Sequence, residues 1–446
     1  MQDRNYSADV VIVGAGTAGS AAAIAAADQG ADVLLVEQAG AAGGSGTIGL
    51  VTPMMTTRIP GNPLCSYVSG EIGRRMAAIG AASGDGFRFD PMMLAFVLEQ
   101  MLMERGVRML FHTALTGVRM EGRRVESLRA FNKSGQVRIT GRAFIDATGD
   151  GDLCALAGLP MLHGDEETGK NQPVSLRYVL GGVDTAAFRG FLNERGANLT
   201  GDYLSGAVTT APNREWPLAG LFREAIAAGD LMPDDMVYWQ FFSLPGRADS
   251  IAFNCPEFFD LHDADDAENL TFVQLRGKQA ILRQLLFCRK YLRGFEKAYV
   301  SAVSSIVGVR ESRRAVTDYI ITADDLIARR KFSDVIAQSN YPIDVHGRRL
   351  NHPDDAFNGE ENRPWFEVPL RALIVKDADN LLVAGRCLGA EFIAQSAIRI
   401  IPTCRAMGEA AGIAASIACR AGAVHDVDGV AVRAEMIRRG ARFAAS

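Results

Sequence analysis

Three glycines and one carboxylate near the start of the chain have the types and spacing of a nucleotide-binding site. Gly14, Gly16 and Gly19 follow an apolar run, and Glu37 closes the next one. With this spacing the first glycine permits a tight turn, the second lets backbone approach a pyrophosphate, and the third lets a helix pack on the strand. Glu37 stands where a carboxylate accepts hydrogen bonds from a ribose 2'-hydroxyl and repels a 2'-phosphate. The pattern predicts a dinucleotide site and disfavours NADP.

Further glycine-bearing segments occur at 39–47, 147–151 and 385–386, each at the end of an apolar run or just after one. A helix predicted to begin at Pro402-Thr403 would direct its positive end at a flavin. An FAD molecule is long enough to use all of these segments, whereas plain turns and an ordinary helix start are the alternative. The residues predicted to bind the cofactor are Gly14, Gly16, Thr17, Ala18, Gly19, Glu37, Gln38, Gly43, Gly44, Ser45, Thr47, Ala147, Thr148, Gly149, Gly385, Arg386, Arg399 and Thr403.

Few residues are candidates for the reaction itself. His346 stands two residues after Asp344, whose carboxylate can orient an imidazole, so His346 is the candidate base. Arg310 and Arg371 are candidates for holding an acidic substrate, because a guanidinium donates two parallel hydrogen bonds to a carboxylate. The alternatives are a core or surface histidine, and arginines that brace a domain junction through ion pairs. His163 is a weaker candidate.

The elements that must position these residues follow an α/β pattern. Apolar runs at 108–112 and 143–148 fit a parallel sheet, and the runs 116–121, 124–131 and 136–140 between them predict an antiparallel meander. Asp90-Pro91 begins a predicted helix that ends near Arg105, and further helices are predicted at 269–291 and from 402 to about 419. Strands are predicted at 174–180, 298–307 and 380–386. We predict an α/β fold in which residues 1–160 and 377–446 form a Rossmann-like FAD-binding domain and 161–376 an inserted mixed α+β substrate domain.

Composition restricts the class of protein. The chain has 446 residues, 48% of them hydrophobic, and a formal net charge of −5 without any block of Lys and Arg. This argues against a nucleic acid partner. Seven widely spaced cysteines form no CxxC pair and suggest reduced thiols. We therefore expect a cytoplasmic protein with no metal and no membrane partner, which acts on a small molecule; a homo-oligomer is left open.

The chain resembles the glutathione reductase type of two-dinucleotide-binding flavoprotein, a superfamily that also holds the fumarate reductase and succinate dehydrogenase flavoproteins. Ala147-Thr148-Gly149-Asp150 is similar to its ATG motif. Within the superfamily the chain is most similar to the bacterial FAD-dependent oxidoreductases, through Gly308–Arg314, Val368–Arg371 and Asn380–Ala415. Leu370 stands where a tyrosine is expected in that group, so no role of that tyrosine carries over.

The resemblance implies FAD as the cofactor and oxidoreductase activity. No second nucleotide fingerprint follows, so electrons are expected from the substrate or from a transiently bound donor. The leading expectation is a dehydrogenase or oxidase that removes a hydride from a small acidic or polyhydroxylated substrate to flavin N5. The alternatives are an ene-type reductase of an unsaturated acid, or a flavoprotein with isomerase or lyase chemistry. The substrate, the electron acceptor and covalent attachment of FAD are left open.

Overall fold

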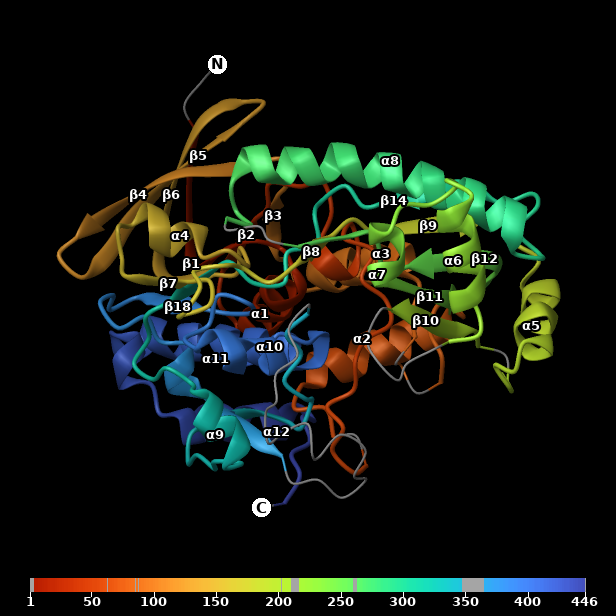
Figure 1. The fold of residues 1–446 in the computed structure, drawn as a ribbon. Helices are drawn as coiled ribbons and strands as arrows, with labels where there is room; N and C mark the ends of the chain where they lie inside the picture. Colours follow the sequence, from red (N-terminus) through yellow and green to blue (C-terminus); the bar gives the residue numbers. More distant parts are fainter. Residues whose placement is uncertain are drawn as a thin grey trace.

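A computed structural model describes residues 4–61, 63–84, 86, 88–201, 203–209, 216–259, 263–346 and 365–445. One sheet is built from both halves of the chain, and a second sheet lies at the other side of the molecule (Figure 1). Helix α8 runs along the outside of both (Figure 1). The mixed α/β architecture confirms the predicted fold class.

The first sheet has a parallel centre. Its strands are β1 (Arg4–Val13), β2 (Val33–Val36), β3 (Arg108–Leu110), β6 (Gly135–Asp146) and β18 (Leu381–Val383). They pair in parallel in the order β3-β2-β1-β6, with β18 also on β6. β1, β2 and β18 end in runs of buried Val, Ile and Leu, as parallel strands covered on both faces require. Their carboxyl ends all lie at one edge of the sheet, where the glycine turns follow.

Two helices that are distant in the sequence pack closely on this sheet. They are α1 (Thr17–Asp28) and α11 (Ile401–Ala421). A Cβ atom at Gly408 would lie 2.1 Å from the backbone oxygen of Ala18, and one at Gly412 would lie 2.2 Å from that of Ala22. The small residues of both helices are therefore required for their contact, and the helix predicted from Pro402 is confirmed.

The antiparallel meander is formed by β4 (Ala114–Glu121), β5 (Arg124–Asn132) and the first half of β6. The runs predicted separately at 136–140 and 143–148 are one continuous strand, so that division was wrong. The reason is that β1 begins at Arg4, well before residue 9, and pairs with β6 through Gly141, whose partner is Ala8. A long partner strand keeps β6 extended across its glycine.

The second sheet is antiparallel, in the order β10-β11-β12-β9-β14. The bounds of its strands are β9 (Tyr178–Gly181), β10 (Ser205–Thr209), β11 (Tyr238–Leu244), β12 (Arg247–Phe253) and β14 (Tyr299–Val303). The strand predicted at 174–180 is two strands, because β8 (Val174–Ser175) leaves this sheet to pair with β13 (Glu257–Phe258). Aromatic side chains fill the core, with Trp239, Phe241 and Phe253 all buried.

Four helices accompany the second sheet: α5 (Thr185–Glu194), α6 (Ala219–Ala227), α7 (Asp234–Val237) and α8 (Ala267–Tyr291). The helix predicted at 269–291 is thus confirmed. The core of this sheet is made by side chains from 174 to 307, whereas buried side chains from 321 onward belong to the two cores on the faces of the first sheet. The predicted division at residues 160 and 377 stays a prediction. The packing favours a second boundary near residue 321, where the chain re-enters the core of the first sheet.

The remaining elements connect and cover these two sheets. They are α2 (Tyr67–Ala78), α3 (Pro91–Glu104), α4 (Asp152–Leu156), β7 (Met161–His163), β15 (Arg313–Ala315), α9 (Ala323–Ile327), β16 (Val335–Ser339), β17 (Phe366–Pro369), α10 (Phe392–Ile398) and α12 (Gly429–Arg439), with short 3-10 turns at 44–46, 370–372 and 424–426. Asp90 caps α3 as predicted, accepting a hydrogen bond from the amide of Met92. Among the described residues, no helix combines the length and apolarity needed to cross a bilayer.

Candidate active site

A cavity of about 1330 Å³ opens where the central strands of the first sheet end. Fourteen of the eighteen residues predicted to bind the cofactor line it: Gly14, Gly16, Thr17, Ala18, Glu37, Gln38, Gly44, Ser45, Ala147, Thr148, Gly149, Gly385, Arg386 and Arg399. They come from four segments spread over most of the chain. Ligands of open α/β sheets bind at this edge, outside the carboxyl ends of the strands.

The glycines bring these segments together at distances that no side chain would permit. Gly14 has a φ of +94°, and a Cβ there would lie 2.4 Å from the oxygen of Ala147. A Cβ at Gly44 would lie 2.9 Å from the Cα of Gly16, and Gly44 also has a positive φ. The result is a continuous backbone cradle that a phosphate group can approach.

Glu37 holds this cradle from one side. Its two carboxylate oxygens accept hydrogen bonds from the amides of Ala15 and Ala39, each at 2.7 Å. Each oxygen keeps a further lone pair for a ribose hydroxyl. The side chain lines the cavity, in the position that the sequence predicts for the ribose partner.

Four predicted cofactor residues do not line the cavity but support it. Gly19 packs α1 on the turn, since a Cβ there would lie 1.8 Å from the oxygen of Gly14. Gly43 donates its amide to the oxygen of Ala15, and the Thr47 hydroxyl donates to Ala42. Thr403 is buried in the first turn of α11.

Polar atoms without partners mark the other end of the cavity. Arg386 pairs with Asp150 through Nη2 at 3.0 Å, and Arg399 contacts Asp344 through its own Nη2 at 3.2 Å. Nη1 of Arg386 and Nε of Arg399 are buried and have no hydrogen-bond partner among the described residues. Buried donors of this kind need an acceptor. A flavin ring edge would supply acceptors for them, so the donor set fits the cofactor.

His346 lies between two carboxylates next to this end. Its Nδ1 lies 2.9 Å from Oε1 of Glu257, and its Nε2 lies 3.6 Å from Oδ1 of Asp344. The ring meets that of Tyr238 edge-on, with centroids 5.3 Å apart. His346 does not itself line the large cavity, but Asp344 joins it to Arg399, which does.

Arg310 belongs to the same group. Its Nη2 lies 2.6 Å from Oε1 of Glu257, and its Nη1 donates to the oxygen of Pro173. Burial acts to raise the pKa of Glu257, but the charges of Arg310 and His346 outweigh it and lower that pKa. The pKa of Asp344 is lowered in the same way: burial acts to raise it, but the contacts with His346 and Arg399 outweigh that effect. Both carboxylates are therefore ionised around the imidazole.

A family comparison explains the cofactor cavity. Residues 9–436 match the family model described as FAD dependent oxidoreductase. The chain belongs to this family. FAD is therefore its cofactor, and the protein is an FAD-dependent oxidoreductase. No curated protein matches the chain significantly.

The chain is also similar, at low sequence identity, to several solved structures. A geranylgeranyl bacteriochlorophyll reductase-like protein from Thermoplasma acidophilum is 12% identical, with a TM-score of 0.48 over 97% of this chain and 84% of that one. A triple mutant of a flavin-dependent brominase is 13% identical, with a TM-score of 0.47 over the same two shares. p-Nitrophenol 4-monooxygenase from Pseudomonas putida is 10% identical, with a TM-score of 0.47 over 98% of this chain and 87% of that chain.

Two further arginines lie apart from the FAD cavity: the candidate Arg371, and Arg314 at the end of the segment Gly308–Arg314. Arg371 does not line it; its Nε lies 2.9 Å from Asp334, and its side chain is 48% exposed. Arg314 is buried, lies 3.2 Å from Glu311 and donates to the oxygen of Ala390. For these two arginines the bracing alternative describes the contacts that the structure shows.

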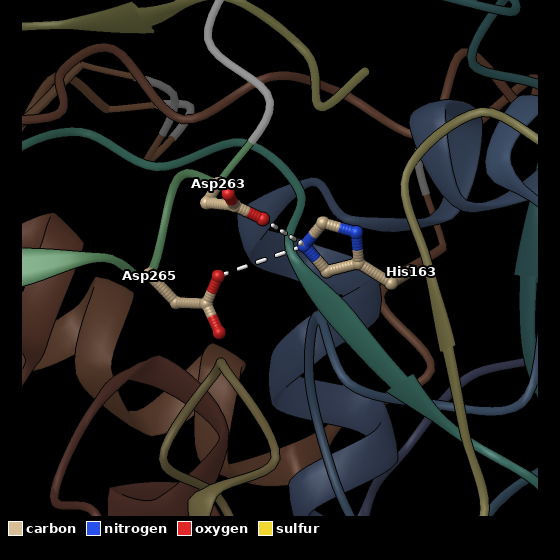
Figure 2. A group of neighbouring side chains, drawn as sticks. All are labelled: His163, Asp263 and Asp265. Carbon is tan, nitrogen blue, oxygen red and sulfur yellow. Dashed lines mark ion pairs between the residues drawn. The ribbon is translucent and has the colours of Figure 1, made fainter. Parts of the chain in front are cut away.

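His163 faces Asp263 and Asp265 across a surface loop (Figure 2). Its Nε2 lies 3.8 Å from the first carboxylate and 3.6 Å from the second. Among the described residues this is the one group of three side chains that could hold a metal ion. Arg313 already neutralises Asp265, with Nε 2.9 Å from its other oxygen. The sequence expectation that the protein holds no metal stays a prediction.

Two members of the polar group were missed by the sequence reasoning, Glu257 and Arg177. Arg177 is held close enough to Arg310 for the two charges to interact, and burial together with that charge lowers its pKa to about 9. The available signal was weak. Glu257 is a charged residue directly after Cys255-Pro256, and Arg177 interrupts the largely apolar run 174–180.

Proposed function

We propose that this FAD-dependent oxidoreductase oxidises a small substrate that carries a carboxylate, with His346 as the base. The contact chain from Arg399, in the wall of the FAD cavity, through Asp344 to His346 is the observation that carries the proposal. Bound FAD supplies a hydride acceptor there. A hydroxyl or amine proton of the substrate passes to the imidazole as the C–H bond gives up its hydride, so two electrons and both hydrogens leave the substrate.

The carboxylates prepare His346 for this role. An imidazole that donates Nδ1–H to Glu257 presents a lone pair at Nε2, and the proton taken there faces Asp344. A flanking carboxylate both fixes the tautomer and stabilises the imidazolium that forms. Asp344 itself is held by Arg399 and by the hydroxyl of Tyr341 at 3.3 Å.

Excess positive charge supports an acidic substrate. Arg177, Arg310 and Arg399 face two carboxylates in the described part of this group, Glu257 and Asp344. A substrate carboxylate would restore the balance, and burial of an ionic group is tolerated when it is paired and hydrogen-bonded.

The same cluster of charged side chains, with His346 protonated, suits the reverse reaction, which is reduction of an unsaturated acid. The nearness of Arg177 to Arg310 favours this as the second candidate, because two neighbouring guanidinium groups can hold the carboxylates of an unsaturated acid. We further propose that the fold is of the glutathione reductase type, on the evidence of the turn at 147–149, and that the sheet around Trp239 supplies the substrate side of the site.

Anaerobic mixing tests the direction of the reaction. 2-Hydroxy acids, 2-amino acids and saturated dicarboxylates are added in turn to the oxidised holoprotein, and unsaturated dicarboxylates to the photoreduced one. Loss of the visible flavin absorbance with a member of the first panel supports oxidation; its return with the second supports reduction. Product formation without any electron acceptor would contradict both.

The variant His346→Gln tests the base. We expect flavin reduction by the reactive acid to slow by about 10²-fold or more, the scale of general base catalysis, while FAD stays bound. His425→Gln is the matched control, since His425 pairs with Asp318 at 2.8 Å outside the site. Equal rates in the two variants would remove His346 from the mechanism. The methyl ester of the reactive acid should bind at least about 10-fold more weakly than the acid, because the charged hydrogen bonds are lost.

A further inference from the structure

Helix α8 carries an exposed apolar stripe that begins beside Phe258, passes the rim of the FAD cavity at Leu275 and continues along the helix. Phe272, Leu275, Leu282 and Leu286 are 48%, 61%, 58% and 56% exposed. The opposite face, with Val273, Ile281 and Phe287, is buried in the core. Four large exposed apolar side chains on one helix are more than scattered surface residues, which marks an interaction surface.

The spacing of the stripe is that of a helix-pairing seam. Together with the exposed Gln279, the four residues follow one another at intervals of 3, 4, 3 and 4. This is the a/d repeat through which two helices interlock side chains. A polar residue in such a seam fixes register and orientation at some cost in stability.

The stripe is also symmetric about its centre. Gln279 is the middle residue of α8, with Phe272 and Leu286 each seven positions away and Leu275 and Leu282 four and three away. A two-fold axis at Gln279 would therefore place Phe272 of one copy against Leu286 of the other, in an antiparallel pair. Isologous contacts of this kind need a surface that is complementary to itself.

Charges at the two ends of the helix obey the same symmetry. Glu268 and Lys290 lie eleven positions before and after Gln279, and both are exposed. Antiparallel pairing brings the carboxylate of one copy to the ammonium of the other, twice. A parallel pair would oppose like charges at both ends, which destabilises it. Lys290 also contacts Asp230 of its own chain at 2.6 Å, which leaves its ammonium on the surface, 60% exposed.

We infer that α8 is the dimer contact of this protein, formed with the α8 of a second copy in antiparallel orientation. Helix α8 is 25 residues long, which gives a seam of up to about 37 Å at 1.5 Å per residue. It lies along the outer edge of the molecule, where a second copy has access to it (Figure 1).

Light scattering of the FAD-loaded protein tests the contact. We expect twice the mass of one chain for the wild type and the mass of one chain for Leu282→Glu, with bound FAD unchanged. Leu282 does not line the FAD cavity. The control is Phe96→Glu on α3, where the side chain is 68% exposed, and it should keep the double mass. A single-chain wild type, or a Leu282→Glu protein that stays dimeric, would overturn the inference. So would a monomer that binds anionic phospholipid vesicles through α8.

Cysteine pairing tests the orientation and does not depend on the charged variant folding. All seven native cysteines are buried, so an added surface cysteine reacts on a low background. Under mild oxidation Gln279→Cys should form a covalent dimer, because the two copies of this position meet at the axis. Leu286→Cys should not form a covalent dimer, because position 286 of each copy lies across from Phe272 of the other copy, so the two added cysteines are far apart. Efficient linkage at Leu286 with none at Gln279 would indicate another arrangement and refute the antiparallel pair.

Discussion

Glu409 should make the stability of this protein depend on pH. The residue lies in α11, fully buried, and accepts hydrogen bonds through Oε2 from the Ser66 hydroxyl at 2.7 Å and the Val68 amide at 3.1 Å. Its Oε1 is buried without a partner among the described residues. A protonated Oε1 is the form that this environment favours. Burial raises the pKa of the carboxyl from 4.5 to about 8, although the two hydrogen bonds oppose the shift.

The sign of the effect follows from linkage. Because the pKa is higher in the folded protein than in the unfolded chain, the folded state binds the proton more tightly. The resulting stabilisation is complete below pH 4.5 and is lost as the pH rises towards 8. With 1.36 kcal/mol per pKa unit, the loss between pH 5 and pH 7 is on the order of 2.5 kcal/mol.

The assay compares urea unfolding of the wild type and Glu409→Gln at these two pH values. Glutamine imitates the protonated carboxyl, so the variant should lack this part of the pH dependence, and the difference between the two proteins should grow by about 2.5 kcal/mol from pH 5 to pH 7. Glu104→Gln, which removes an exposed carboxylate that pairs with Arg75, should follow the wild type. Parallel pH profiles for the wild type and Glu409→Gln would show that the buried carboxyl is ionised at neutral pH and refute the reasoning.

Three further predictions concern the site. Asp344→Asn should lower kcat/KM by about 10²-fold with FAD retained, because His346 and Arg399 lose the carboxylate that they share. In steady-state kinetics the control Asp334→Asn, which removes a surface ion pair with Arg371, should change kcat/KM less than about twofold. Gly44→Ala should abolish FAD retention through gel filtration because its Cβ meets backbone at 2.9 Å, whereas Gly73→Ala, with open space around it, should purify yellow. Glu37→Ala should weaken FAD binding about 10-fold or more in a fluorescence titration of the apoprotein. The variant loses the hydrogen-bond partner of the ribose and the acceptor for the amides of Ala15 and Ala39. Unchanged affinity would place the ribose elsewhere.

The cofactor end of the site was predictable because its signals are local. Gly14, Gly16 and Gly19 follow one strand at a fixed spacing. The structure shows the steric demand on Gly19 as a distance of 1.8 Å to the oxygen of Gly14, and the demand on Gly14 as a distance of 2.4 Å to the oxygen of Ala147. The same holds for Thr148 and Gly149 after their strand. Such positions are recognised from their spacing after a strand, even though Gly14 makes its close approach to the distant residue Ala147.

The substrate end was only partly predictable, because long-range contacts make it. Asp344 was found through its nearness to His346 in sequence, whereas Glu257 reaches the same imidazole from a strand in another part of the chain. Arg371 resembled Arg310 in sequence, but one pairs with Asp334 on the outside and the other with buried Glu257. Tertiary packing decides which of these arginines is buried at the site, and the local sequence does not indicate it.

The close approach of α1 and α11 has a consequence for how the protein is made. The ribosome synthesises the glycine turn at 14–19 first, but the backbone of Ala18 and Ala22 is covered only by Gly408 and Gly412, close to the end of the chain. Strand β18, which completes the parallel centre, also comes late. The N-terminal half therefore leaves the ribosome with an open apolar surface and an unfinished cradle. We expect FAD capture to coincide with the end of translation, so that a prematurely terminated chain holds no flavin and is exposed to quality control.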